Sequence, residues 1–184
     1  MDVLDQQLEE RGLVIVYTGN GKGKTTAALG LVIRAIGYGL KVGMIQFIKG
    51  EWHYGELNGA KRLEPEFDLI LGGKGFVGIL DDDHPFEDHV RAAEAALELA
   101  KRRILSGNYR LFILDEINYA IKLGLISTES VLELIKVKPQ QMTLVLTGNH
   151  ADSQIISISD LVTEMKEIKH PFKAGIKAQR GIDF

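Results

Sequence analysis

Short apolar runs recur along this chain and predict buried β-strands. Most are rich in Val, Ile and Leu and nearly continuous, as expected for strands that are covered on both faces. The predicted strands are residues 13–17, 41–48, 67–71, 111–115, 143–147 and 161–168, of which 67–71 is the weaker pattern.

The segments between these runs carry helix-forming patterns. Helices are expected over residues 25–37, 87–105, 128–137 and 152–159. The first should end near Gly37 or Gly39, where glycine readily takes the left-handed cap conformation. Ser127 or Thr128 should cap the third helix, because a hydroxyl accepts a hydrogen bond from a free backbone N–H there.

Strands that alternate with helices indicate an α/β protein with a doubly wound, mainly parallel sheet. The 184 residues contain no repeat, low-complexity tract or Pro/Ser-rich linker. We therefore expect one domain over residues 1–184, in which residues 1–10 form a short tail or helix. Residues 49–62 and 72–86 are long, glycine-containing connections, which are typical of functional loops.

Composition excludes several function classes. The chain has no cysteine, so disulfides, thiolate zinc sites, iron–sulfur clusters and cysteine nucleophiles are ruled out. The 22 basic and 25 acidic residues give a net charge of -3, which disfavours a nucleic-acid partner. No apolar run is long enough to span a bilayer, and the acidic N-terminus lacks a signal core. These features predict a cytoplasmic protein without a membrane partner.

The strongest chemical signal is a glycine-rich loop between a predicted strand and a predicted helix. It reads Thr-Gly-Asn-Gly-Lys-Gly-Lys-Thr-Thr over residues 18–26. Glycines let backbone N–H groups turn toward phosphate oxygens, and the helix N-terminus adds a positive dipole end. Lys24 supplies a charge and Thr25 a hydroxyl for Mg²⁺. The residues expected at the nucleotide are Gly19, Asn20, Gly21, Lys22, Gly23, Lys24, Thr25 and Thr26.

One position of this loop departs from the general phosphate-loop pattern. Thr18 stands where that pattern has its first glycine, so a strict motif search would miss the loop. The alternative interpretation is a glycine-rich turn without a ligand. The order of strand, loop, Gly-Lys-Thr and helix strongly disfavours that alternative, because it is the context that phosphate binding requires.

Two carboxylates end the predicted strand at residues 111–115. Asp115 and Glu116 would lie at the carboxyl edge of the sheet, where open α/β sheets bind ligands. From there a carboxylate can reach a cation that Thr25 holds. The pair therefore predicts a metal site for Mg²⁺, or for Mn²⁺ in its place, in a P-loop NTPase fold of the RecA-like type.

Residue patterns alone leave the reaction open. One alternative is a conventional P-loop ATPase or phosphotransferase that releases ADP, and a second is a RecA-like nucleic-acid motor. The acidic net charge and the lack of a basic stripe disfavour the motor. Arg34 is compatible with a solvated position on the first helix, and Phe76, between glycines, with either a ligand contact or a loop anchor.

Several segments together resemble the P-loop type of ATP:corrinoid adenosyltransferase. The similar stretches cover nearly the whole chain from residue 9, and the most specific are Gln-Phe-Ile-Lys-Gly and the C-terminal tail. They are residues 9–12, 18–28, 34–37, 42–50, 55–56, 114–116, 147–148, 162–165, 169–170, 174–179 and 181–184.

This resemblance implies an unusual use of the phosphate loop. In the family, the Co(I) centre of a reduced corrinoid attacks C5′ of ATP, and inorganic triphosphate leaves. ATP lies reversed relative to ordinary P-loop NTPases, with its γ-phosphate where the α-phosphate usually lies. The implied substrates are ATP and a reduced corrinoid: cobalamin, cobinamide or an a,c-diamide precursor. An electron donor such as a reduced flavoprotein and a homodimeric assembly are also implied.

The resemblance also assigns residue roles. It places Gly19 to Thr25 on the triphosphate, and Asn20 and Arg34 on the nucleoside or nearby phosphates. Thr25 and Glu116 hold the metal, and Lys24, Glu116 and Phe76 serve catalysis. Phe76 matches an aromatic that faces the corrin and expels its lower axial ligand. The family loop commonly reads Gly-Phe-Thr-Trp, whereas here Gly78 replaces the tryptophan.

Overall fold

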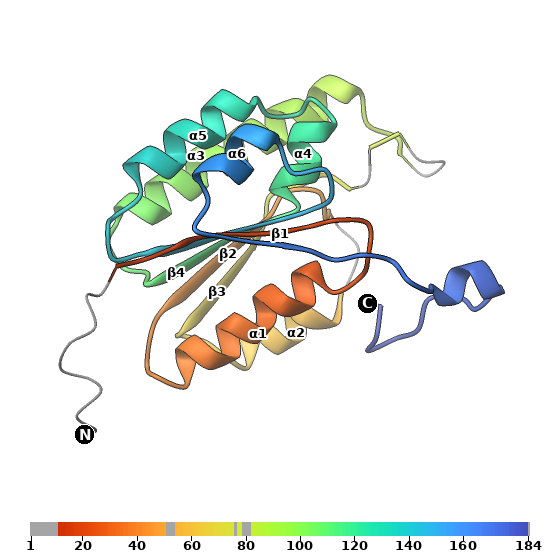
Figure 1. Ribbon diagram of the computed structural model, residues 1–184, viewed down its shortest axis with the longest axis horizontal. Helices are drawn as coiled ribbons and strands as arrows, with labels where there is room; N and C mark the ends of the chain where they lie inside the picture. The colour runs from red at the N-terminus through yellow and green to blue at the C-terminus, as the bar shows by residue number, and fades with distance from the viewer. Residues whose placement is uncertain (1–10, 51–53, 76, 79–81, 184) are drawn as a thin grey trace.

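Six parallel strands form one sheet at the centre of the molecule. A computed structural model describes residues 11–50, 54–75, 77–78 and 82–183. The strand order is β3-β2-β4-β5-β1-β6, and every pairing is parallel (Figure 1). The strands are β1 (Val14–Thr18), β2 (Val42–Gln46), β3 (Phe67–Leu71), β4 (Leu111–Asp115), β5 (Thr143–Thr147) and β6 (Leu161–Glu164). The predicted α/β class with a parallel sheet is confirmed.

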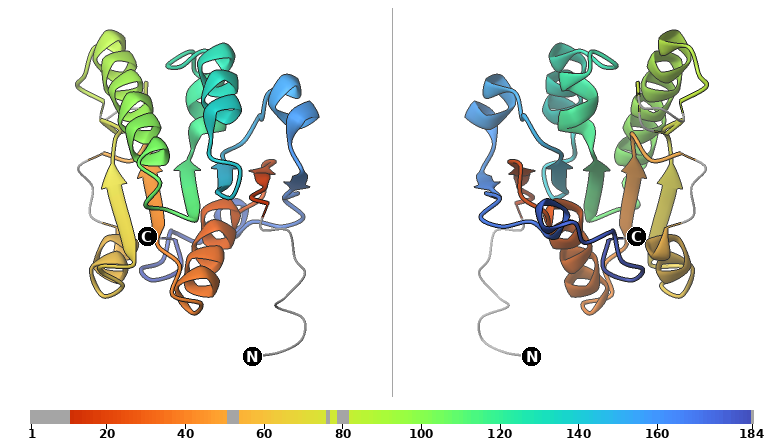
Figure 2. Two further views of the ribbon diagram at one scale, coloured as in Figure 1. Left: turned by 90° about the vertical axis from the view of Figure 1, so that its left-hand side faces the viewer. Right: turned by 90° about the vertical axis from the view of Figure 1, so that its right-hand side faces the viewer.

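Helices cover both faces of this sheet (Figure 2). One face carries α1 (Lys24–Ile36) and α2 (Gly55–Lys61). The opposite face carries α3 (Phe86–Leu105), α4 (Ile117–Lys122), α5 (Thr128–Val137) and α6 (Ser153–Ile158). A short 3₁₀ helix, Pro171–Ala174, follows in the C-terminal tail.

Alternate residues of the central strands serve two separate cores. In β4, Phe112 and Leu114 pack in the core under α3 to α6. Leu111 and Ile113 pack in the core on the side of α1 and α2. Because both faces of β4 are buried, its sequence is continuously apolar rather than alternating.

The structure corrects the predicted elements at a few places. Residues 49–62 contain α2, and α4 follows β4 directly, although the sequence pattern predicts neither helix. Both are short and depend on packing: Ala60 of α2 and Ile117 of α4 are buried. The last strand ends at Glu164 rather than Ile168, because the chain then leaves the sheet. At the end of α1 the prediction of a left-handed glycine is confirmed for Gly39, whereas Gly37 stays right-handed.

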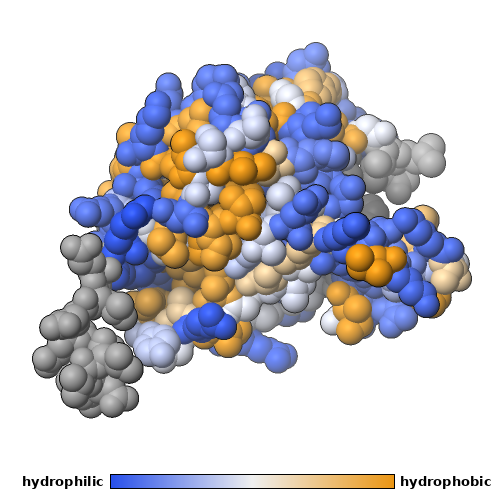
Figure 3. All heavy atoms as spheres, in the orientation of Figure 1, coloured by the Kyte–Doolittle hydropathy of each residue, from blue (hydrophilic) through white to orange (hydrophobic). Residues whose placement is uncertain are grey.

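The outer strand β6 leaves apolar side chains on the surface. Figure 3 shows an apolar patch over α6 and β6, and we call it the α6–β6 patch. Its residues are Ile156, Ile158, Leu161 and Val162, which are 39–46% exposed. Within the described part of the chain, no helix has the length and apolar character that a membrane crossing requires.

Candidate nucleotide site

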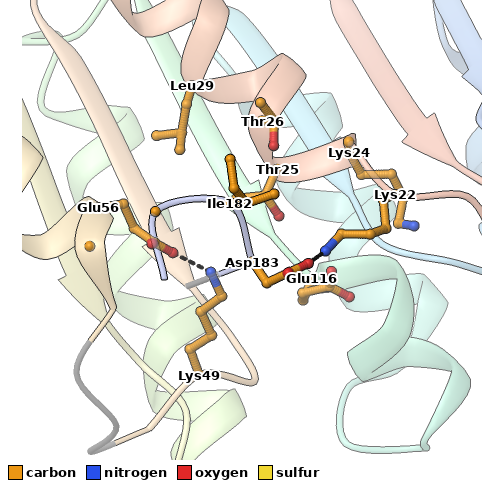
Figure 4. A pocket seen from close by; sticks show the side chains of 13 residues that line it. Lys22, Lys24, Thr25, Thr26, Leu29, Lys49, Glu56, Glu116, Ile182 and Asp183 are labelled. Carbon is orange, nitrogen blue, oxygen red and sulfur yellow. Dashed lines mark hydrogen bonds and ion pairs between the residues drawn. The ribbon is translucent and has the colours of Figure 1, made fainter. Parts of the chain in front are cut away.

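A cavity of about 650 Å³ lies where the phosphate loop, the carboxyl ends of β2 and β4, and the C-terminal tail meet (Figure 4). Its position at the carboxyl edge of a parallel sheet is the usual ligand site of open α/β folds. It is lined by Lys22, Gly23, Lys24, Thr25, Thr26, Leu29, Lys49, Gly55, Glu56, Glu116, Gly181, Ile182 and Asp183.

The phosphate loop needs glycine where its backbone takes positive φ. Gly19 has φ +93° and Gly23 has φ +109°, conformations that L side chains rarely adopt. A Cβ on Gly19 would also lie 2.4 Å from the carbonyl oxygen of Met165. Thr18 fits its place because its hydroxyl accepts a hydrogen bond from the Ala151 N–H at 3.1 Å. The departure from the general motif therefore anchors the loop to the segment between β5 and α6.

Lys24 is held over the loop at the start of α1. Its Nζ donates to the carbonyl oxygens of Gly19 and Gly21, both at 2.8 Å. The first turn of α1 contains no acidic residue, and no side chain caps it. Backbone N–H groups and a positive dipole end therefore face the cavity beside a lysine ammonium, an arrangement that suits a phosphate.

Asp115 lies behind Thr25 and is fully buried. Its Oδ1 accepts from the Thr25 hydroxyl at 2.8 Å and from the Thr147 hydroxyl at 2.7 Å. Its Oδ2 accepts from Gln46 Nε2 at 3.0 Å. Both carboxyl oxygens are thus engaged, and Asp115, which is not among the cavity-lining residues, reaches the site through Thr25. The sequence predicts a metal ligand at Asp115, and the structure places this carboxyl group behind the Thr25 hydroxyl and outside the cavity lining.

Glu116 is the carboxylate that lines the cavity itself. It precedes α4 with φ +63°, and its N–H donates to the Thr147 hydroxyl at 2.9 Å. Positive φ at a non-glycine residue is uncommon, and it clusters at functional sites. Burial, with the nearby Asp115 adding to it, raises the pKa of Glu116 from 4.5 to about 7, although Lys24 and Lys49 oppose the shift.

The oxygen groups of Thr25 and Glu116 fit a magnesium ion. Both line the same cavity, and hard cations prefer oxygen ligands. Mg²⁺ usually takes only one or two protein ligands and completes its shell with waters and phosphates. Among the described residues, no group of three or more His, Cys, Asp or Glu side chains is arranged to hold a metal ion.

An ion pair on the far side of the cavity was not predicted from the sequence. Lys49 Nζ pairs with Glu56 Oε1 and lies 4.7 Å from the centre of the Tyr54 ring. Burial alone would raise the pKa of Glu56, but the hydrogen bond from Lys49 and its charge hold that pKa below its usual range. A signal for the pair is present in the sequence, because both residues fall in stretches that resemble the family.

Some of the other predicted site residues lie on the phosphate loop, and others lie away from the cavity. Asn20 is exposed on the loop, and Gly21 is buried within it. Arg34 is exposed in the last turn of α1, nine residues from Thr25, which corresponds to about 14 Å along a helix axis. The structure therefore does not bring Arg34 to this cavity. Phe76 lies outside the described residues.

Comparison with known proteins gives a family for nearly the whole chain. Residues 10–184 match the model of the family described as ATP:corrinoid adenosyltransferase BtuR/CobO/CobP. The chain is 40% identical to a corrinoid adenosyltransferase of Escherichia coli K12, over 97% of this chain and 89% of that protein. It is 41% identical to one from Pseudomonas aeruginosa, over 97% and 87%.

A solved structure supports the fold alone. A KaiC-like protein, PH0186 from Pyrococcus horikoshii, superposes with a TM-score of 0.55 over 86% of this chain and 75% of its own. At 19% identity this likeness extends to the sheet and helices, not to chemistry.

The raised pKa of Glu116 predicts how stability depends on pH in a metal-free buffer. The folded protein holds a proton on this carboxyl that the unfolded chain releases at lower pH. Between pH 4.5 and 7, the free energy of unfolding of the wild type should therefore fall relative to that of Glu116→Gln. Below pH 4.5 and above pH 7, the difference in free energy of unfolding between the two proteins should become constant.

Urea denaturation of both proteins in EDTA across this pH range would measure the effect. Glu129→Gln, which removes an exposed glutamate from the first turn of α5, is the charge-matched control. The raised pKa of Glu116 would be contradicted if the free energy of unfolding changed equally with pH in the wild type and in Glu116→Gln. It would also be contradicted if the wild-type value rose relative to that of the variant.

Proposed function

This chain belongs to the ATP:corrinoid adenosyltransferase family, and we propose that it transfers the 5′-deoxyadenosyl group of ATP to the Co(I) centre of a corrinoid. The match over residues 10–184 is the observation that carries this proposal. In the reaction, Co(I) donates an electron pair to C5′, the cobalt–carbon bond forms, and the C5′–O bond breaks. Inorganic triphosphate leaves with the electrons of that bond.

The site supports this reaction because the protein needs to supply position and charge rather than a base. Co(I) is itself a strong nucleophile, so no side chain has to remove a proton. Negative charge builds on the leaving triphosphate as the C5′–O bond breaks, and groups that bind it more tightly then accelerate the step. We propose that Lys22, Lys24 and the N–H groups at the start of α1, which line the cavity, bind that triphosphate.

Thr25 and Glu116 are the residues that would hold Mg²⁺ or Mn²⁺. When bound, such an ion would neutralise charge on the triphosphate. Asp115 keeps the Thr25 hydroxyl in place through the 2.8 Å hydrogen bond. Thr147 holds the backbone of Glu116 in a similar way, because its hydroxyl accepts from that N–H.

We further propose a substrate class, an electron donor and a compartment for the reaction. The corrinoid is cobalamin, cobinamide or an a,c-diamide precursor, and a reduced flavoprotein or similar donor supplies its electrons. The cytoplasm is the fitting compartment, because it is reducing and a Co(I) intermediate must be protected from oxidation.

We also propose that the protein is a homodimer. The α6–β6 patch lies on the outer strand of the sheet and is apolar over four neighbouring side chains. Contiguous exposed apolar surface of this kind is typical of protein interfaces. Light scattering should therefore give about twice the chain mass of 20.4 kDa. A mass that stays at 20.4 kDa at micromolar concentration would refute the dimer.

A single reaction separates adenosyl transfer from conventional ATP hydrolysis. The protein is incubated with MgATP and chemically reduced cobalamin, and the products are identified. Adenosylcobalamin in the visible spectrum and triphosphate by phosphorus NMR are the expected products. ADP with phosphate, and no adenosylcobalamin, would instead indicate an ATPase or phosphotransferase.

Lys24→Ala should abolish productive turnover. Loss of a charge-assisted contact costs about 1.5–3 kcal/mol in binding, which corresponds to roughly a 10- to 150-fold weaker affinity for MgATP. Turnover should fall further, since the charge on the leaving group peaks after binding. Calorimetry and the spectral assay measure the two effects. Lys136→Ala, at an exposed lysine of α5, is the control, and near wild-type turnover by Lys24→Ala would rule out the phosphate-loop role.

Phe76→Ala tests the proposed role of this aromatic in corrinoid reduction. A phenyl ring against the corrin would displace the lower axial ligand, and a four-coordinate Co(II) is easier to reduce. The variant should therefore lose much more activity with Co(II) corrinoid and a reductase than with Co(I) prepared chemically. Equal losses in the two assays would make Phe76 an ordinary binding or packing residue.

A further inference from the structure

The C-terminal tail begins against the phosphate loop. Directly after β6, the Met165 N–H donates to the Thr18 carbonyl at 2.8 Å, and the Gly21 N–H donates to the Met165 carbonyl at 2.7 Å. Two backbone hydrogen bonds therefore tie the start of the tail to the first half of the loop.

The same tail returns to the loop further along the chain. Gly181, Ile182 and Asp183 line the nucleotide cavity, and the carboxylate of Asp183 forms an ion pair with the ammonium of Lys22 (Figure 4). This contact joins the tail to the phosphate-binding loop beside the cavity. Lys22 is one of the two lysines of the loop that can bind an anion.

A hydrogen-bonded turn holds Asp183 in place. Its Oδ2 accepts from the Gln179 N–H at 2.7 Å, and its own N–H donates to the Gln179 carbonyl at 2.8 Å. The Ile182 N–H donates to that carbonyl at 3.1 Å, and Gly181 has the positive φ, +80°, that the turn requires. We call residues 179–183 the C-terminal turn.

The C-terminal turn has little buried surface to hold it against the cavity. Between residues 165 and 183 no residue is buried, so the segment contributes almost no core. The side chains of Lys22 and Asp183 remain 49% and 23% exposed. Contacts of this kind sit at the low-stability end of a structure and open at small cost in free energy.

We propose that Asp183 competes with the nucleotide's phosphates for Lys22, so that the C-terminal turn opens when a triphosphate binds. A carboxylate and a phosphate use the same point charge on a lysine, and two anions beside one another repel. In this proposal the repulsion between the two anions makes the triphosphate take the place of the Asp183 carboxylate at Lys22. The inference rests on the proposed function only in taking a triphosphate as the ligand.

Asp183→Asn tests this competition. An amide oxygen can still accept from Gln179, so the turn keeps its hydrogen bond while the negative charge is lost. Exposed ion pairs of this type make modest contributions, so the affinity for MgATP and for inorganic triphosphate should rise about two- to fivefold by calorimetry. An unchanged or weaker affinity would overturn the proposal.

Two further variants show that the effect passes through Lys22. Glu167→Gln removes a carboxylate from the same tail, where it pairs with Lys173, and should leave both affinities unchanged. In a Lys22→Gln background, Asp183→Asn should no longer raise the affinity. Tightening by Glu167→Gln as well, or undiminished tightening in the Lys22→Gln background, would reflect net charge alone and would overturn the specific competition.

Hydrogen exchange gives a readout that does not depend on catalysis. On addition of inorganic triphosphate to the wild type, the Gln179 and Asp183 amides should exchange faster, because their hydrogen bonds belong to the opened turn. Unchanged or slower exchange at these amides would overturn the proposal. Failure of the proposed function would look different: no adenosylcobalamin would form, whatever Asp183→Asn does to triphosphate affinity.

Discussion

The buried carboxyl group of Asp115 is the point on which the site depends. It receives hydrogen bonds from Thr25, Thr147 and Gln46, which belong to α1, β5 and β2. A buried carboxyl group costs several kcal/mol unless such partners satisfy it, so the three donors are fixed where they are. Through Thr25 the contact positions the start of α1. Through Thr147 it positions the backbone of Glu116, and hence the carboxylate at the cavity.

The three lysines that line the cavity have partners within the protein. Lys24 binds the loop's own carbonyls, Lys22 binds Asp183, and Lys49 binds Glu56. An anionic ligand that binds one of these lysines competes with a partner that is already there. The net free energy of binding is then that of the new ion pair minus that of any ion pair which the ligand replaces. The carboxylates that line the cavity therefore influence the affinity for an anionic ligand, as the lysines do.

The fold and the chemistry have different origins in this molecule. The sheet and its helices are shared with a KaiC-like protein at 19% identity, so the architecture alone does not select a reaction. The chemical groups of this chain gather at the sheet's carboxyl edge, and the C-terminal tail returns to the same place. The relatives of 40–41% identity are corrinoid adenosyltransferases, and they share the chain over nearly its whole length.

The sequence by itself determined the features that depend on near neighbours in the chain. The apolar run of β4, the glycines of the phosphate loop and the carboxylates at residues 115–116 were all predicted, because burial on both faces and positive φ leave local patterns. The helices α2 and α4 were missed, since six or seven residues are too few to show a helical period and are stabilised by packing.

Only the tertiary structure decided which distant groups meet. The pairs Lys49–Glu56 and Lys22–Asp183 carry no spacing rule, and the second joins residues that are far apart in the sequence. Burial raises the pKa of Glu116 and accompanies the position of Asp115 behind Thr25. The sequence pattern predicts that a strand is buried, but it does not predict whether the side chains after the strand are buried. The physical reason is that desolvation and charge pairing depend on distance in space, whereas a sequence pattern records only distance along the chain.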